Sequence, residues 1–333
     1  MGMGFYRDMA LDLGTATIQG AGKGQGVVLR APSLGAAHRQ TGQLVAVGQA
    51  AREMLDRTPG TLSARTPLAR GVIADGGLTT EMLRIFLKQV LGRGLGKPRL
   101  LLAVPTGISP VEERALIEAT LQAGAGKVYL MEAPLAAAVG AGLNVDSPRG
   151  QLVMDLGAGV TDGGVIALGR VMASVCTTAA GDRLEEALIQ AVRRDHDLAL
   201  GRQTAREVKH TMGDAPMTVK GRCLTTGLPR EADLTPDQVQ RAFRPVVEEI
   251  LTALRDLLEQ TPPDLAEDVR ETGILLTGGG SLLPGLAETI RDATGIQTTV
   301  AQDPELAVIL GLEATLPHLN KRKDGPLDLA KQR

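Results

Sequence analysis

One short pattern occurs twice in this chain, once near its start and once near its middle. Met9 to Gly22 reads MALDLGTATIQGAG, and Val153 to Ile166 reads VMDLGAGVTDGGVI. In each copy an apolar run reaches Asp-Leu-Gly, bends through small residues and resumes as an apolar run. The pattern predicts two β-hairpins, each with an aspartate at the edge of a glycine-rich bend.

Such a bend can bind an anion through backbone N–H groups, because no Cβ stands between the backbone and the ligand. The aspartate beside it can hold Mg²⁺ through water or orient an attacking water. Two facing hairpins could therefore grip a triphosphate and its metal. The alternative is that each bend is an ordinary tight turn whose aspartate caps its own backbone.

A third glycine run favours the phosphate interpretation over the ordinary turn. Thr277-Gly278-Gly279-Gly280 follows another apolar run of strand length. The sequence contains no G-x-x-x-x-G-K-[ST] motif, and no G-x-G-x-x-G follows a strand-like run. Neither a P-loop nor a Rossmann site is indicated.

The order of the expected elements indicates an internal duplication. A chain of 333 residues is longer than one core usually fills. After the first hairpin, apolar runs at 98–105 and 127–133 are each followed by a helical pattern, and from residue 151 the same outline begins again. We therefore predict an α/β protein with mixed sheets, built from two related lobes with a cleft between them.

Capping residues and prolines predict several helix boundaries. In the first half we expect a helix over 81–91 capped by Thr79 or Thr80, a helix that opens with a capping box at Ser109, and a small-residue helix from Pro134 that can pack close to a neighbour. In the second half we expect a helix over 181–200 and a shorter one over 202–212. A long helix should run from Thr235 to 261–263, and Pro245 should kink or divide it.

Composition excludes some classes of partner. With a net charge of -2 and 2% aromatic residues, neither electrostatics nor base stacking favours nucleic-acid binding. Cys176 and Cys223 lie far apart without CxxC spacing, so a reducing cytoplasm is the expected compartment. No segment reaches the roughly 18 apolar residues of a membrane-spanning helix.

Longer motifs are spread over nearly the whole chain. They include DLGTA, GVIADGGLTTEMLR, VPTGISPVEERA, EAPLAAAVGAGL, MDLGAGVTD, GDRLEEAL and TGGGSLLPGL. Their order and spacing resemble those of the MreB family of bacterial actins, within the actin, sugar kinase and Hsp70 superfamily. The resemblance implies duplicated actin-like (ribonuclease H-like) domains in two lobes around a nucleotide cleft. Lobe I would be 1–145 plus 308–333, with a small subdomain at about 33–69, and lobe II would be 146–307, with a small subdomain at about 182–246.

The same resemblance implies that ATP and Mg²⁺ bind in the cleft. Asp12 and Asp155 would be the catalytic carboxylates and would hold the metal, through water. The nucleotide-binding residues would be Gly14, Thr15, Ala16 and Thr17 in the first hairpin, Gly157, Ala158, Gly159, Val160 and Thr161 in the second, Gly181, Arg206, Glu207 and Lys209 on the helices that follow, and Gly278, Gly279, Gly280 and Ser281 in the third glycine loop.

Three positions depart from the family pattern. The glutamate thought to polarise the hydrolytic water is Ala133 here, and the neighbouring Glu132 would point to the opposite face of a strand. Arg206 replaces a glutamate expected to accept hydrogen bonds from the ribose, and Thr17-Ile18 replaces Asn-Thr. Weakened ATP hydrolysis and normal hydrolysis therefore both stay open.

Proteins of this family polymerise into paired protofilaments beneath the bacterial membrane and position the cell-wall elongation machinery. The resemblance thus implies an ATP-binding cytoskeletal protein that associates with itself and with membrane proteins of cell shape and peptidoglycan synthesis. The loop at 92–97 offers one apolar residue, Leu95, for weak peripheral contact with the inner face of the membrane. Two alternatives are a degenerate partner that caps or co-polymerises with another MreB, and a non-polymerising enzyme like the sugar kinases.

Overall fold

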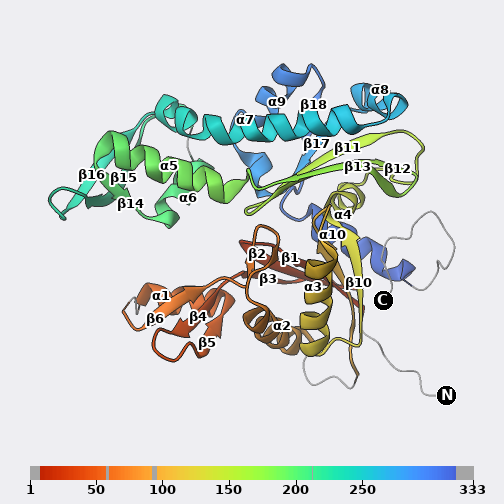
Figure 1. The fold of residues 1–333 in the computed structure, drawn as a ribbon, viewed down its shortest axis with the longest axis horizontal. Helices are drawn as coiled ribbons and strands as arrows, with labels where there is room; N and C mark the ends of the chain where they lie inside the picture. Colours follow the sequence, from red (N-terminus) through yellow and green to blue (C-terminus); the bar gives the residue numbers. More distant parts are fainter. Residues whose placement is uncertain (1–7, 58–59, 92–95, 212, 320–333) are drawn as a thin grey trace.

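The chain forms two five-stranded mixed sheets with equivalent strand orders (Figure 1). The computed structural model describes residues 8–57, 60–91, 96–211 and 213–319. The first sheet contains, in spatial order, β3 (Gly26–Pro32), β2 (Thr17–Gly22), β1 (Asp8–Leu13), β9 (Arg99–Val104) and β10 (Lys127–Glu132). The second contains β13 (Arg170–Thr177), β12 (Thr161–Ala167), β11 (Gln151–Leu156), β17 (Ile274–Thr277) and β18 (Thr298–Val300).

The pairing of strands repeats from one sheet to the other. β1 and β2 pair antiparallel, as do β2 and β3, whereas β9 and β10 continue the sheet in parallel from β1. In the second sheet β11, β12 and β13 are likewise antiparallel, and β17 and β18 continue in parallel from β11. The predicted duplication and the mixed sheets are confirmed.

Amphipathic helices cover the outer face of each sheet. α2 (Gly76–Leu91) and α3 (Pro110–Gln122) pack on the first sheet, and Met82, Leu83 and Phe86 of α2 are buried there. The second sheet is covered by α5 (Gly181–His196), α7 (Pro236–Gln260), α8 (Pro263–Thr272) and α9 (Leu286–Thr294), whose apolar residues form one cluster with β11 and β17. Each lobe therefore has a core of its own.

Two short helices lie between the sheets and join the lobes. α4 (Ala133–Gly140) follows β10, and α10 (Ala307–Thr315) follows β18, so the two helices occupy equivalent places in the duplicated fold. They contact each other closely and share one apolar cluster with residues of both sheets. A Cβ on Gly140 would lie 2.7 Å from the Gly311 nitrogen, and a Cβ on Gly311 would lie 2.8 Å from the Gly140 nitrogen. Small residues are therefore required where the helices cross.

A smaller sheet extends from each lobe, on the left in Figure 1. In the first lobe β4 (Gly35–His38), β5 (Leu44–Val47) and β6 (Leu62–Arg65) carry α1 (Gly48–Arg57), and the short strands β7 (Leu68–Ala69) and β8 (Val72–Ile73) follow. In the second, β14 (Leu198–Leu200), β15 (Met217–Cys223) and β16 (Pro229–Leu234) lie beside α5 and α6 (Arg202–Thr211).

Several helix boundaries differ from the sequence expectations. α2 begins at Gly76, and its cap is Asp75, whose Oδ1 accepts from the Leu78 N–H at 3.0 Å; the hydroxyls of Thr79 and Thr80 donate back to carbonyls one turn earlier. The predicted cap at Thr79 or Thr80 is therefore wrong. α7 runs unbroken through Pro245, so that proline does not divide it.

Other boundaries follow from local chemistry. The capping box at Ser109 is confirmed, and Thr235 forms a second one with Gln238. The helix predicted over 181–200 stops at His196, because Asp197 is in the left-handed conformation with φ 49° and the chain continues as β14. Helices α1 and α8 were not expected from the sequence.

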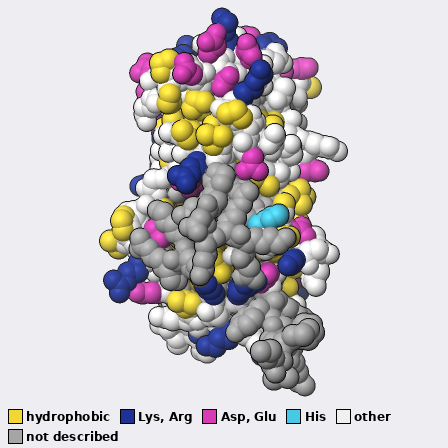
Figure 2. Space-filling model, turned by 90° about the vertical axis from the view of Figure 1, so that its right-hand side faces the viewer, with side chains coloured by type: hydrophobic (Ala, Val, Ile, Leu, Met, Phe, Trp, Pro, Cys, Tyr) yellow, Lys and Arg dark blue, Asp and Glu magenta, His cyan; other side chains and the backbone are white. Residues whose placement is uncertain are grey.

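Figure 2 shows one side face of the molecule, with hydrophobic side chains grouped in its upper part among interspersed acidic and basic ones. Contiguous apolar surface of this kind is typical of faces that contact other macromolecules. Among the exposed apolar residues of the second lobe are Leu168, which is 49% exposed and lies in the turn between β12 and β13, and Met172, which is 47% exposed and lies on β13.

The loop proposed for membrane contact lies mostly outside the described residues, since 92–95, including Leu95, are not described. Among the helices of the described ranges, none is long and apolar enough to cross a membrane.

Candidate functional site

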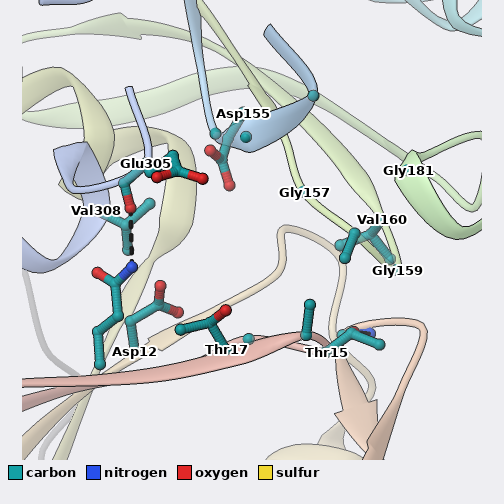
Figure 3. Close-up of a pocket in the computed structure, with 18 of the residues that line it drawn as sticks. Asp12, Thr15, Thr17, Asp155, Gly157, Gly159, Val160, Gly181, Glu305 and Val308 are labelled. Carbon is teal, nitrogen blue, oxygen red and sulfur yellow. Dashed lines mark hydrogen bonds between the residues drawn. The ribbon is translucent and has the colours of Figure 1, made fainter. Parts of the chain in front are cut away.

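A cavity of about 480 Å³ lies between the two lobes, where both glycine-rich bends meet (Figure 3). The first bend connects β1 to β2 and the second connects β11 to β12, and each is closed by the antiparallel register of its strands. In the second bend the Gly157 N–H donates to the Val160 carbonyl at 2.9 Å. A Cβ on Gly159 would lie 2.9 Å from the Cβ of Thr15. The bends therefore face each other at a distance that only glycine allows.

The third glycine loop packs directly on the second hairpin. Gly278 has φ 76°, and a Cβ there would lie 2.8 Å from Oδ1 of Asp155 and 2.7 Å from the Leu156 carbonyl carbon. Thr277, at the end of β17, donates its hydroxyl to Oδ1 of Asp155 at 3.0 Å. Because β17 lies beside β11, the parallel register places this loop against the Asp155 carboxylate.

Asp12 and Asp155 extend into the same space from opposite sheets (Figure 3). Burial, with repulsion from the Asp155 carboxylate as a second cause, raises the pKa of Asp12 to about 7. Burial also raises the pKa of Asp155 to about 6, although the hydrogen bond from Thr277 opposes the shift. Two carboxylates held together in a poorly solvated cleft favour a bound cation.

These raised pKa values predict how the stability of the metal-free protein depends on pH. At these two carboxylates the folded state binds more protons than the unfolded state between about pH 4 and pH 7, so their contribution to the free energy of unfolding should fall as pH rises through this window. Replacing Asp12 with Asn removes the contribution of one such carboxylate and should make the free energy of unfolding fall less steeply with pH than in the wild type. Denaturant titrations of both proteins in EDTA, at several pH values, measure the difference. Equal slopes for the two proteins would contradict the assignment.

The sequence analysis did not single out Asp162, yet it joins the two lobes at the cleft. Asp162 lies on β12 and is 1% exposed. Its carboxylate accepts hydrogen bonds from the Thr106 N–H at 2.8 Å and from the Thr106 hydroxyl, and Thr106 belongs to the first lobe. Burial raises the pKa of Asp162 to about 7 despite these hydrogen bonds, and the carboxylates of Asp155 and Glu132 add to the shift.

Glu185 on α5 is a second lining residue that the sequence analysis missed. Its side chain is fully buried and accepts from Arg206 Nε at 2.9 Å and from Lys209 Nζ at 2.8 Å. Burial alone would raise the pKa of Glu185, but the hydrogen bonds from Arg206 and Lys209 lower it below its usual range. Lys209 Nζ also lies 3.4 Å from the Gly181 carbonyl. The guanidinium of Arg206 is thus engaged with a carboxylate.

Most of the predicted site residues surround this cavity. Those that line it are Asp12, Gly14, Thr15, Ala16, Thr17, Asp155, Gly157, Ala158, Gly159, Val160, Gly181, Arg206, Lys209, Gly278, Gly279 and Gly280. Ala133, the departure from the family pattern, lines it as well.

Four predicted residues lie outside the lining. Thr161 is buried and donates to the Ala179 carbonyl at 2.7 Å, and Ser281 is buried and donates to the Gly278 carbonyl at 2.6 Å. Glu207 is exposed and accepts from Gln203. Glu132 is exposed at the end of β10, and the next residue, Ala133, lines the cavity instead.

The duplicated sheets, the helix pair between them and the interlobe cleft define an actin-like protein. A sequence profile described as MreB/Mbl protein matches residues 6–324. The chain is 38% identical over 325 residues to the cell shape-determining protein Mbl of Bacillus subtilis (strain 168), covering 95% of this chain and 98% of that protein. It is 41% identical over 320 residues to the cell shape-determining protein MreB of Escherichia coli (strain K12), covering 92% of each. The chain belongs to the MreB/Mbl family.

Solved structures agree with this assignment. MreB5 of Spiroplasma citri bound to AMPPNP superposes with a TM-score of 0.89 at 32% identity, over 96% of this chain and 98% of that one. The MamK double helical filament has a TM-score of 0.80 at 21% identity, over 94% and 99% of the two chains, and shows the same fold.

Proposed function

We propose that this protein binds Mg-ATP in the interlobe cleft and polymerises into filaments that act as a cytoskeletal scaffold for cell shape. The observation that carries the proposal is the pair of glycine-rich bends that face each other, with one carboxylate beside each. Backbone N–H groups in such bends bind phosphate oxygens, and the two carboxylates would help to hold a magnesium ion that binds with the nucleotide. Titration of a fluorescent ATP analogue with and without Mg²⁺ tests the binding step.

The residues fit a magnesium ion that arrives with its nucleotide. Among the described residues, there is no cluster of three or more His, Cys, Asp or Glu side chains that could hold a metal ion on its own. Mg²⁺ commonly binds through one or two carboxylates, several waters and the phosphates of the substrate. Asp12 and Asp155 would hold the ion in this way, and the ion would neutralise phosphate charge.

The relatives support the assembly part of the proposal. The curated relatives are named for determining cell shape, MreB5 was solved with AMPPNP and with ADP, and MamK was solved as a double helical filament. By this similarity the chain would assemble with itself in the cytoplasm, close to the membrane and its wall-elongation proteins. These relatives do not favour a capping partner or a sugar-kinase-like enzyme.

The division into lobes belongs to the same proposal. We assign 1–145 with 308–333 to lobe I and 146–307 to lobe II, with the small sheets of 33–69 and 182–246 as subdomains. The packing of α10 against β1 and β2 supports the return of the chain to lobe I near residue 308.

Hydrolysis is expected to be slow, because Ala133 lines the cleft where the family pattern has a glutamate. A general base contributes roughly 10² to 10⁴ to such a rate, and a newly added carboxylate should recover part of it. Ala133→Glu should therefore raise phosphate release from Mg-ATP by about tenfold or more. The first turn of α4 also tolerates a negative charge, since it is the positive end of the helix dipole.

The control is Ala133→Gln, which has a similar size but no carboxylate. It should release phosphate at the wild-type rate. If the wild type hydrolyses ATP at an ordinary rate and Ala133→Glu adds nothing, another residue orients the water and the assignment of Ala133 is wrong.

A further inference from the structure

Helix α1 reaches the cleft from the small sheet of the first lobe. Gln49 and Arg52 both line the cavity, and they lie three residues apart on one face of α1. Ala51 points the other way, is fully buried and packs with Ala36 and Leu62 of the small sheet. The packing of Ala51 therefore fixes which face of α1 meets the cleft.

The start of α1 is anchored next to the cleft wall. Gly48 has φ 62°, and its N–H donates to the Leu34 carbonyl at 2.7 Å. A Cβ on Gly48 would lie 3.3 Å from the Cβ of Ala31 and 3.4 Å from the ring of Phe86. Ala31 itself lines the cavity, at the end of β3. Arg52 is thus held one helical turn from a fixed point on the wall.

Arg52 differs from the other Lys and Arg side chains of the cavity. Arg30 pairs with Glu305 at 2.6 Å, and Arg206 and Lys209 both pair with Glu185. Half-buried Arg52 makes no ion pair and no hydrogen bond within the described parts of the chain. Among the Lys and Arg side chains that line the cavity, Arg52 is the one for which the described side chains supply no ion-pair partner.

A bound nucleoside triphosphate would be stabilised by a cation that is not already paired with a carboxylate. It keeps excess negative charge after one Mg²⁺ has bound, and a guanidinium can form two parallel hydrogen bonds to phosphate oxygens. Arg206 and Lys209 would have to leave Glu185 to reach it, and the freed Glu185 carboxylate would then be buried unpaired. Arg30 would have to break its pair with Glu305. Arg52 can bind phosphate at no such cost.

We propose that Arg52 binds the terminal phosphate of the bound nucleoside triphosphate and thereby couples the small sheet of the first lobe to the state of the nucleotide. The inference rests on the proposed function, because it assumes that the cleft binds ATP. A diphosphate lacks the group that Arg52 would hold, so α1 and the strands it packs on would be tied to the cleft in the ATP state alone.

The test compares affinities for Mg-ATP and Mg-ADP in the full chain, measured by calorimetry. Arg52→Ala should weaken Mg-ATP binding about tenfold and Mg-ADP binding less than about twofold, because a charge-assisted contact is lost only with ATP. Arg52→Lys, which keeps the charge but not the paired donors, should lose about threefold with ATP. Arg57→Ala is the matched control, since this exposed arginine lies in the last turn of the same helix.

The outcomes separate the two proposals. Equal losses for ATP and ADP in Arg52→Ala, or no loss for either, would overturn the role of Arg52 while leaving nucleotide binding intact. A wild type that binds neither nucleotide would overturn the proposed function as well. If Arg52→Ala unfolds, Arg52→Gln gives the same comparison with a polar side chain of similar length.

Discussion

Asp155→Asn is expected to weaken Mg-ATP binding by about 100-fold while raising the melting temperature of the nucleotide-free protein. Asparagine can still accept the hydrogen bond that Thr277 donates at 3.0 Å, so the loop around Gly278 keeps its support. The variant loses a carboxylate that would hold Mg²⁺, and even supporting contacts to a metal contribute 10- to 100-fold to affinity. It also loses the repulsion that helps to raise the pKa of Asp12.

The prediction is specific because Asp155→Asn should raise the stability of the nucleotide-free protein while lowering its affinity for Mg-ATP. A substitution that merely damages the fold would lower both stability and affinity. Thermal unfolding with and without Mg-ATP measures the two effects in one experiment, since a ligand that binds only the folded state raises its stability. Asp146→Asn, at an exposed position outside the cavity, should change neither. Normal Mg-ATP binding by Asp155→Asn would remove Asp155 from the site.

Gly140→Ala and Gly311→Ala are expected to lower the free energy of unfolding by about 3 kcal/mol or more. Alanine in a helix gains roughly 1 kcal/mol over glycine, so propensity alone would predict the opposite. The close crossing of α4 and α10 makes both substitutions destabilising, because each added Cβ would lie within 2.8 Å of a backbone nitrogen of the other helix. Overlap with backbone cannot be relieved by rotating a side chain.

Gly76→Ala is the control for these variants. Gly76 also lies in a helix, but a Cβ there would meet open space, so Gly76→Ala should be neutral or should stabilise the protein by up to about 1 kcal/mol. Denaturant unfolding of the three variants measures the comparison. If Gly140→Ala and Gly311→Ala are as stable as Gly76→Ala, the lobes are not joined by this close contact.

The features that the sequence predicted well are those whose chemistry is local. The two hairpins depend on neighbouring residues, and the box at Ser109 needs only Glu112. The duplication was visible because the same order of apolar runs occurs twice. The helix from Pro134 was expected to pack closely on a neighbour, and its small residues do so.

The features that the sequence did not predict depend on contacts between distant segments. Glu185 is 21 residues from Arg206, and only the packing of α5 against α6 brings them together. Asp162 is 56 residues from Thr106, across the two lobes. Likewise the sequence does not show that Gly140 packs against Gly311, because any helix with small residues could have packed against α4 in the same way. Asp75 was overlooked as a cap because the expected helix started several residues too late.

Nucleotide-dependent assembly tests the proposed function most directly. Wild-type protein and Asp155→Asn are sedimented with Mg-ATP, with Mg-ADP and without nucleotide, and the pellets are viewed by electron microscopy. We expect filaments of the wild type with Mg-ATP, and none from Asp155→Asn at the same concentrations. Wild-type protein that stays in the supernatant with Mg-ATP, or Asp155→Asn filaments that form as readily as those of the wild type, would contradict the proposed function.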